Sequence, residues 1–234
     1  MTYPDPSYGN YLIFPPIMSG LQGGNADFGR EWNTNHVGNE NIDVFNARRT
    51  GSYWRASLGG MMLHPSQVDE WDAFVDAAEG MANPVLFRLN SKRFAITKEL
   101  IGTGDGTNKA FQLKKSRSYQ GSDPKVEIIK FPWHNYPPMV LPNGITVLPT
   151  EYVQIYTGSD AATATEKTLE TEWDVARETG IVTLVTAPAD GVNVYATCKY
   201  LIKVHMQDYM PIASTGGGAY TFSSNAEVFE PKGE

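Results

Sequence analysis

The sequence predicts a mainly β protein of the α+β type with a single amphipathic helix. Apolar residues recur with a helical period over residues 65–79, whereas from Gly102 onward they alternate as they do in strands. Turn-forming and strand-forming residues are plentiful, with 22 glycines, 15 prolines and 12% aromatic residues. Several short strands separated by turns are typical of a β-sandwich or barrel. The 234 residues, 41% of them hydrophobic and 19% charged, suffice for one large folded domain or two small ones.

The helix is predicted over residues 65–79 because its apolar and acidic residues lie on opposite sides. The apolar side has a helical spacing and consists of Val68, Trp71, Phe74, Val75 and Ala78. The acidic side consists of Asp69, Asp72, Asp76 and Glu79. Ser66 and Asp69 fit a capping box, and Pro65 at the first helical position is an alternative start. Gly80 is expected to end the helix.

The first 29 residues are rich in Tyr, Pro, Gly and Asn, and we expect an extended arm that lies on a neighbouring molecule. Within this arm residues 11–14 predict one short strand, which Pro15 and Pro16 end. Apolar patches predict further strands at residues 42–45 and 52–58, and another strand at 84–89 follows the helix. The result is a strand–helix–strand unit near residues 52–89.

Residues 102–206 are predicted to be entirely β. Strands are expected at residues 109–113, 126–129, 145–148, 152–156, 173–176, 181–186 and 192–206. The last is expected to be the longest, with alternate residues from Val192 to Val204 on one apolar face. The small, polar residues 157–172 are expected to form an exposed, mobile loop. In the turn at residues 187–191, Pro188 presets φ and Gly191 accepts a left-handed conformation.

The charge of the chain excludes some partners. The formal net charge is −7, and the densest basic segment, Lys114-Lys115-Ser-Arg117, is too short to form a nucleic-acid-binding face. The apolar runs are too short to span a bilayer, and the first basic residue is Arg30, so a secretory signal is not expected. We therefore expect a protein that is made in a cytoplasm, is not inserted in a membrane and does not recognise nucleic acid.

The sequence predicts no catalytic, cofactor-binding or metal-binding site. The single cysteine, Cys198, lies on the apolar face of a predicted strand, where burial rather than nucleophilic chemistry is expected. The four histidines lack the spacing of a metal site. The segment Gly102-x-Gly-x-Gly106 lacks the spacing of a nucleotide loop and precedes a strand, so a hairpin turn is the better interpretation. Asp105-Gly106 lacks the further oxygen ligands of a calcium loop.

Two features leave a sugar-directed function open. Four carboxylates lie close together in the sequence, and a suitably spaced pair could hydrolyse a glycoside. They are Glu166, Glu170, Glu172 and Asp174. Tryptophans such as Trp71 and Trp173 could stack on a sugar, but their places on a helix and a hairpin equally predict core or interface anchors.

Four groups of motifs follow one another along residues 52–206. They are the helix and strand of Trp71–Arg88; the glycine turn and Phe-Gln-Leu of Ile101–Leu113; Ile128-Ile-Lys-Phe-Pro132; and the hairpin motifs Trp173-Asp-Val, Thr179-Gly-Ile-Val-Thr183 and Ala187-Pro-Ala-Asp-Gly-Val-Asn-Val194. In this order and spacing they resemble the distal tail proteins of siphophages and gene-transfer agents. Two regions depart from that pattern: Lys203-Val-His-Met206 replaces a Pro-Val-Arg-Phe-like segment, and the first fifty residues match poorly.

The resemblance implies a structural virion protein of a tailed bacteriophage, without enzymatic activity or cofactor, that forms a homohexameric ring between the tail tube and the tail-tip hub. Residues 1–100 would be the ring-forming β domain with its helix, residues 101–206 an outward-facing sandwich- or barrel-like β domain, and residues 207–234 a C-terminal arm. Both arms would contact neighbouring subunits. The residues that we assign to these contacts are Tyr11, Leu12, Phe14, Tyr209, Tyr220 and Phe222.

The implied partners are further copies of the chain, the tail tube protein, and the hub and other tail-tip proteins. A glycan of the host surface is a further candidate ligand. The implied location is the tail tip of the virion, after synthesis in the host cytoplasm. Two alternatives remain: another minor tail or baseplate protein of the same β build, or a carbohydrate-binding module or sugar-cleaving enzyme of the tail tip.

Overall fold

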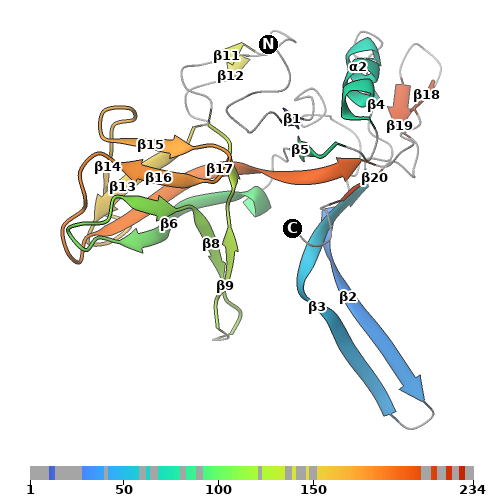
Figure 1. The fold of residues 1–234 in the computed structure, drawn as a ribbon, viewed down its shortest axis with the longest axis horizontal. Helices are drawn as coiled ribbons and strands as arrows, with labels where there is room; N and C mark the ends of the chain where they lie inside the picture. Colours follow the sequence, from blue (N-terminus) through green and yellow to red (C-terminus); the bar gives the residue numbers. More distant parts are fainter. Residues whose placement is uncertain are drawn as a thin grey trace. The chain divides into compact units, whose positions relative to one another are not determined.

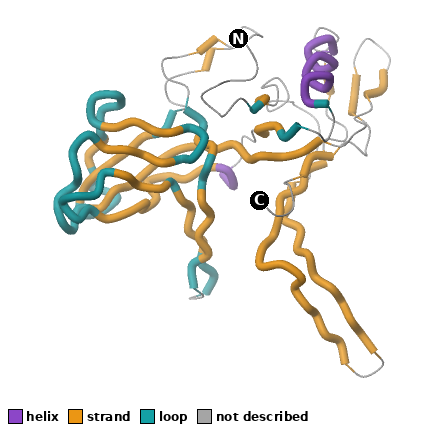
Figure 2. The backbone as a smooth tube through the Cα atoms, viewed as in Figure 1, coloured by secondary structure: helices purple, strands orange, loops and turns teal. Residues whose placement is uncertain are grey.

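The computed structural model confirms a mainly β protein, and the residues that it describes contain one α-helix (Figures 1 and 2). These are residues 11–13, 28–39, 42–57, 62–63, 68–79, 83–87, 92–120, 123–134, 139–140, 146–147, 152–206, 212–214, 220–222 and 227–229. The chain divides into two compact units. The first comprises residues 1–11 and 88–201, and the second comprises residues 12–87 and 202–234.

The first unit is built around the strand β17 (Asn193–Met206), whose first residues pair antiparallel with two neighbours. One neighbour is β13 (Gln154–Gly158), to which β14 (Thr165–Glu166) adds a further strand; the other is β6 (Ala95–Thr103). The β6–β17 register shifts twice, and near the second shift Lys98 takes a φ of 44° while its N–H donates to Thr197 Oγ1 at 2.8 Å. Such bulges increase strand twist, which curls the sheet.

A second sheet packs on the first. It has the order β15 (Trp173–Ala176), β16 (Ile181–Leu184), β7 (Ala110–Gln112). Alternate residues of β15 and β16 are buried, as the predicted hairpin requires. The ring of Phe111 lies directly over Gly102 of β6, where a Cβ atom would come within 2.5 Å of Phe111 Cδ1. The core of this unit therefore lies between two β layers.

Two hairpins and a short helix complete the described part of the first unit. They are β8 (Lys114–Arg117) with β9 (Lys125–Ile128), β11 (Met139–Val140) with β12 (Thr146–Val147), and the 3₁₀ helix η3 (Lys92–Phe94). The two-residue strand β10 (Phe131–Pro132) pairs with Leu201 and Tyr200 of β17.

The second unit contains a sheet in the order β1 (Leu12–Ile13), β5 (Val85–Phe87), β17, β20 (Glu227–Phe229), β3 (Ile42–Ser57), β2 (Phe28–Asn39). Here β17 contributes its last residues, which pair with β5 and β20. A small separate sheet has the order β18 (Ile212–Ser214), β19 (Tyr220–Phe222), β4 (Met62–Leu63).

The helix α2 (Val68–Ala78) lies within the predicted range and has the predicted two-sided character. Trp71, Phe74 and Ala78 are buried, with the Trp71 and Phe74 rings 5.6 Å apart. The acidic residues of the other side are exposed. Burial of one apolar side is what holds a helix of this length in place.

Three sequence-based expectations need correction. The strand β2 was not predicted, and the patches at 42–45 and 52–58 belong to one strand of 16 residues, so β3 rather than β17 is the longest. Residues 157–172 are not a mobile loop, because they contain β14 and a turn in which Asp160 accepts hydrogen bonds. Separately, the described parts of residues 207–234 are three short strands: β18 pairs with β19, β19 with β4, and β20 with β17 and β3.

Candidate functional site

The residues assigned to subunit contacts lie in several places. Leu12 is buried in β1, where it pairs with Val85 of the same chain, and the ring of Tyr11 meets Phe131 edge-on at 5.5 Å. Tyr220 and Phe222 lie in β19. Phe14 and Tyr209 lie outside the described residues. The described residues of this set therefore belong to β1, to the position directly before it and to β19.

Three of the four clustered carboxylates, those of Glu166, Glu172 and Asp174, accept hydrogen bonds from nearby residues. Glu172 accepts a hydrogen bond from the Thr168 N–H at 2.5 Å and pairs with Lys167 Nζ at 2.9 Å. The Thr168 N–H and then the Lys167 ammonium lower the pKa of Glu172 to about 2. A carboxyl group that remains ionised at neutral pH cannot act as a general acid. Glu166 accepts from Gln154, and Asp174 from the Val175 N–H, so these oxygens also serve local contacts.

Two other exposed aspartates cap turns in the same way. Asp105 accepts from the N–H groups of Asn108 at 2.6 Å and Thr107 at 2.8 Å, and these bonds lower its pKa. Asp160 accepts from the hydroxyl and N–H of Thr163, which lower its pKa, and from the Ala162 N–H. Such Asx turns explain these acids without a ligand. Across the described part of the chain, no group of three or more His, Cys, Asp or Glu residues is placed to hold a metal ion.

Two buried titratable residues of the first unit, Cys198 and His134, are neutral near pH 7. Cys198 is 3% exposed, and burial raises the pKa of its thiol to about 12. His134 is 5% exposed, and burial, followed by the charge of Arg177, lowers its pKa to about 4. Its Nδ1 accepts from the Val153 N–H at 3.3 Å, and Trp173 meets its ring edge-on. Both groups are neutral near pH 7 and belong to the core.

A surface hollow of about 370 Å³ lies beside the Lys167–Glu172 ion pair. Threonine hydroxyls and the ion pair supply its polar lining, while Leu184, Pro188 and Val192 supply apolar lining. The threonines are Thr157, Thr171 and Thr186. Its size lies within the range of small-molecule sites, and its mixed lining suits an uncharged polyhydroxylated ligand better than an ion.

The long ribbon of β2 and β3 is the first of two candidate protein-binding surfaces. Its strands pair from Phe28 with Ala56 to Asn39 with Ile42, and Figure 1 shows the ribbon continuing far beyond β20. Within the described sheet β20 pairs only with Arg55, Ala56 and Ser57 of β3, and β2 has β3 as its single neighbour. Along most of the ribbon, therefore, no other strand among the described residues pairs with the outer edges of β2 and β3, and we call these the two open edges.

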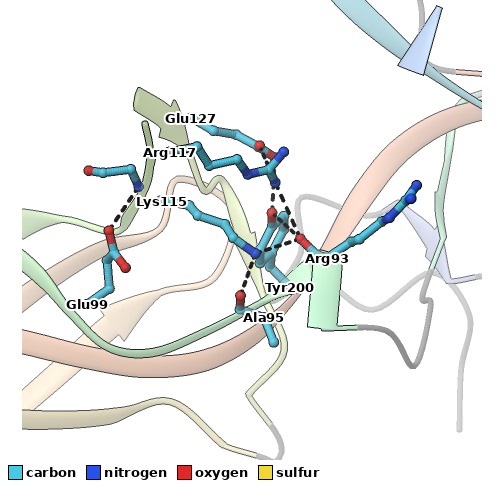
Figure 3. Close-up of polar contacts among 8 residues, drawn as sticks. Arg93, Ala95, Glu99, Lys115, Arg117, Glu127 and Tyr200 are labelled. Atoms are coloured by element: carbon cyan, nitrogen blue, oxygen red, sulfur yellow. Dashed lines mark hydrogen bonds and ion pairs between the residues drawn. The ribbon is translucent and has the colours of Figure 1, made fainter. Parts of the chain in front are cut away.

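The β8–β9 hairpin is the second candidate surface, and polar contacts on one face fix its position (Figure 3). Lys115 Nζ donates to the carbonyl oxygens of Arg93 at 2.8 Å and Ala95 at 2.7 Å. Arg117 pairs with Glu127 across the two strands at 2.9 Å. The Tyr200 hydroxyl lies 3.0 Å from Glu127 Oε1 and 3.1 Å from the Arg93 oxygen, and its one hydrogen can serve either.

Two residues of this network, Tyr200 and Lys115, have shifted pKa values, but their contacts serve to hold the hairpin in place. Burial and then the negative charge of Glu127 raise the pKa of Tyr200, so its hydroxyl stays protonated. Burial and then the charge of Arg117 lower the pKa of Lys115. On the edge of the hairpin, Glu99 Oε1 accepts from the Ser116 N–H at 2.9 Å. Together these bonds hold a two-stranded ribbon that would be marginal by itself.

The sequence suggested neither surface as a site. Of the basic segment Lys114–Arg117, Lys115 and Arg117 form the anchor of the hairpin. No model of a known protein family matches the chain, and the search of curated proteins also finds no match. Among the described residues no helix is long and apolar enough to cross a membrane.

Proposed function

We propose that the chain is a distal tail-type structural protein of a tailed bacteriophage that forms a homohexameric ring between the tail tube and the tail-tip hub. In this proposal residues 1–100 form the ring, residues 101–206 form an outward-facing sandwich- or barrel-like domain, and the virion is the place of action. The role is binding and assembly, with no reaction. The motif order along residues 52–206 and the mainly β fold support it.

The observation that carries the proposal is the β2–β3 ribbon. At 12 residues β2 is about 40 Å long, and a two-stranded ribbon is marginally stable in water. A long open edge also invites pairing with another chain, which monomeric proteins avoid. A neighbouring strand along each edge would satisfy the backbone groups and stabilise the ribbon. The ribbon therefore favours a subunit of an assembly over a self-contained enzyme.

The two open edges favour a ring over a simple dimer. One edge belongs to β2, and the other belongs to the part of β3 beyond β20. When β2 of one copy meets β3 of the next, the contact uses two different surfaces. Such head-to-tail contacts repeat from copy to copy, and they form a ring when the rotation between copies closes. A two-fold dimer would instead pair β2 with β2 and leave both β3 edges open.

A proline scan of β2 tests this proposal. Residues 34–37 pair with residues 47–44 of β3, and successive N–H groups of an antiparallel strand point alternately to its two edges. Single prolines at Thr34, Asn35, His36 and Val37 should therefore fall into two alternating classes. Prolines of the outward class should prevent assembly and leave intact the hydrogen-exchange protection of those β3 amides that face β2. Prolines of the inward class should remove that protection. Normal assembly of all four variants would contradict the proposal.

The hollow beside Glu172 favours a carbohydrate-binding module of the tail tip as the second candidate function. A Thr186→Arg variant would fill part of this hollow without touching the ribbon. Glycan binding by the wild type that the variant loses would support this candidate. Binding of no glycan by a folded wild-type protein would remove it and leave the ring proposal unaffected.

A further inference from the structure

The outward face of the β8–β9 hairpin combines exposed apolar residues with lysines. Val126 and Ile128 are each 52% exposed. Lys114 lies opposite Ile128 in the register, and Lys130 continues the outward alternation, because Ile129 between them is buried. Among described residues neither lysine forms an ion pair. We call the surface formed by Lys114, Val126, Ile128 and Lys130 the hairpin face.

The polar contacts on the opposite side of the hairpin keep the hairpin face ordered. Lys115, Arg117 and Glu127 alternate with the hairpin-face residues (Figure 3). Lys115 binds the hairpin to backbone oxygens of η3 and β6, and Glu127 pairs with Arg117 and accepts from the Tyr200 hydroxyl. A surface that is already ordered loses less conformational entropy on binding than a mobile hairpin would.

A complementary surface exists on α2. Its exposed side carries Asp69, Asp72 and Asp76, whose spacing of three and four residues places them along one stripe, and the exposed Glu79 follows in the turn directly after the helix. The helix has no basic residue, so like charges three and four residues apart repel one another. Ala73 and Ala77 are exposed beside this stripe and leave room for apolar side chains to approach. We call these six residues the helix face.

We propose that the hairpin face of one copy docks on the helix face of the next copy in the assembly. Lys114 and Lys130 meet the acidic stripe, while Val126 and Ile128 cover Ala73 and Ala77. Opposite charges would select the partner surface, and the apolar residues would exclude water between them. The inference rests on the proposed ring, since two different faces that meet head-to-tail give a contact that repeats from copy to copy, as a ring requires.

Two variants of the chain, each with the charge of one face reversed, test the contact between the hairpin face and the helix face. One variant carries Lys114→Glu with Lys130→Glu, and the other carries Asp72→Lys with Asp76→Lys. Each variant alone would bring like charges together at every contact. We expect each to need a concentration at least about tenfold higher than the wild type for half-maximal assembly, measured by sedimentation. The second variant should still fold, because it removes repulsion within α2.

An equimolar mixture of the two variants distinguishes a contact between copies from a contact within one chain. In a ring of alternating variants every contact again joins opposite charges, so assembly should return to near the wild-type concentration. A matched control is Lys125→Glu, because Lys125 lies opposite Arg117 on the other face of the hairpin and should leave assembly unchanged.

The outcomes separate this inference from the proposed function. If the wild type assembles and each charge-reversed variant alone also assembles normally, the two faces do not dock. The same holds if mixing the two variants does not restore assembly. Either result leaves the proposed ring unaffected. A wild type that remains monomeric at all concentrations overturns both.

Discussion

The amide of Gly106 donates a hydrogen bond to the carbonyl oxygen of Pro188 at 2.9 Å. This bond joins two turns that lie far apart in the sequence, the glycine turn after β6 and the turn before β17. Gly104 strengthens the junction, because its N–H donates to Val192 O at 2.7 Å and its own carbonyl accepts from the Gly191 N–H at 3.1 Å. The two turns therefore fold as one structural element.

Gly104→Ala should destabilise the protein by about 2–3 kcal/mol. An added Cβ would lie 2.5 Å from the Ala189 oxygen and 2.6 Å from the Pro188 oxygen, so backbone would have to move. Gly106→Ala is the matched control, because nothing lies near its Cβ and only its φ of +77° is unfavourable, at about 1 kcal/mol. Denaturant unfolding followed by tryptophan fluorescence measures both. A larger loss in Gly106→Ala than in Gly104→Ala would contradict the close approach.

The stability of the first unit should fall as the pH is lowered from about 6.5 to about 4. Burial lowers the pKa of His134 to about 4 in the folded protein, against 6.5 for an ordinary histidine. Between these values the unfolded chain binds a proton that the folded chain does not, so acid favours unfolding by about 2–4 kcal/mol in total.

A His134→Gln variant tests this assignment, since glutamine can still accept the Val153 N–H. Urea unfolding at several pH values should show a weaker pH dependence in the variant over this window. An unchanged dependence would mean that other groups control stability there.

Cys198 should be unreactive in the folded protein. It is 3% exposed, and burial raises its pKa to about 12, so neither access nor thiolate is available at pH 8. A colourimetric thiol reagent should detect almost no thiol under native conditions and one thiol per chain in denaturant. Rapid native labelling would contradict the placement of this strand in the core.

Replacement of Lys115 by methionine should loosen the β8–β9 hairpin. It removes two charge-assisted hydrogen bonds to Arg93 and Ala95 from a partly exposed site, for which roughly 1 kcal/mol is expected. Amide exchange of Val126 and Glu127 should accelerate. Lys114→Met, at the next position and on the opposite face, serves as the control and should leave the exchange rates unchanged when both variants are measured in unassembled, dilute protein.

The sequence correctly predicted those elements that depend on contacts between residues close together in the chain. The helix followed from apolar spacing between Val68 and Ala78, and the β15–β16 hairpin from alternation on both sides of Gly180. The turn at Gly191 has the expected left-handed φ of +78°. In each of these elements the deciding contacts lie within a few residues.

Long-range pairing explains what the sequence did not reveal. The strand β2 contains Asn33, Asn35 and Gly38 and lacks alternation, so its strand conformation depends on the ladder with β3. The docking of the two glycine turns likewise joins residues more than eighty positions apart, which turn propensities cannot indicate. The sequence left a sugar-directed role open for the carboxylates near Glu172, and the structure adds that Glu172 and Asp174 accept hydrogen bonds from nearby backbone N–H groups.

The most direct test of the central claim is the native mass of the purified chain over a concentration series, measured by light scattering. A ring predicts a species near six times 25.8 kDa, about 155 kDa, that is lost in the outward proline variants of β2. A protein that remains at 25.8 kDa at every concentration, with β2 amides protected from exchange in the monomer, would contradict the account.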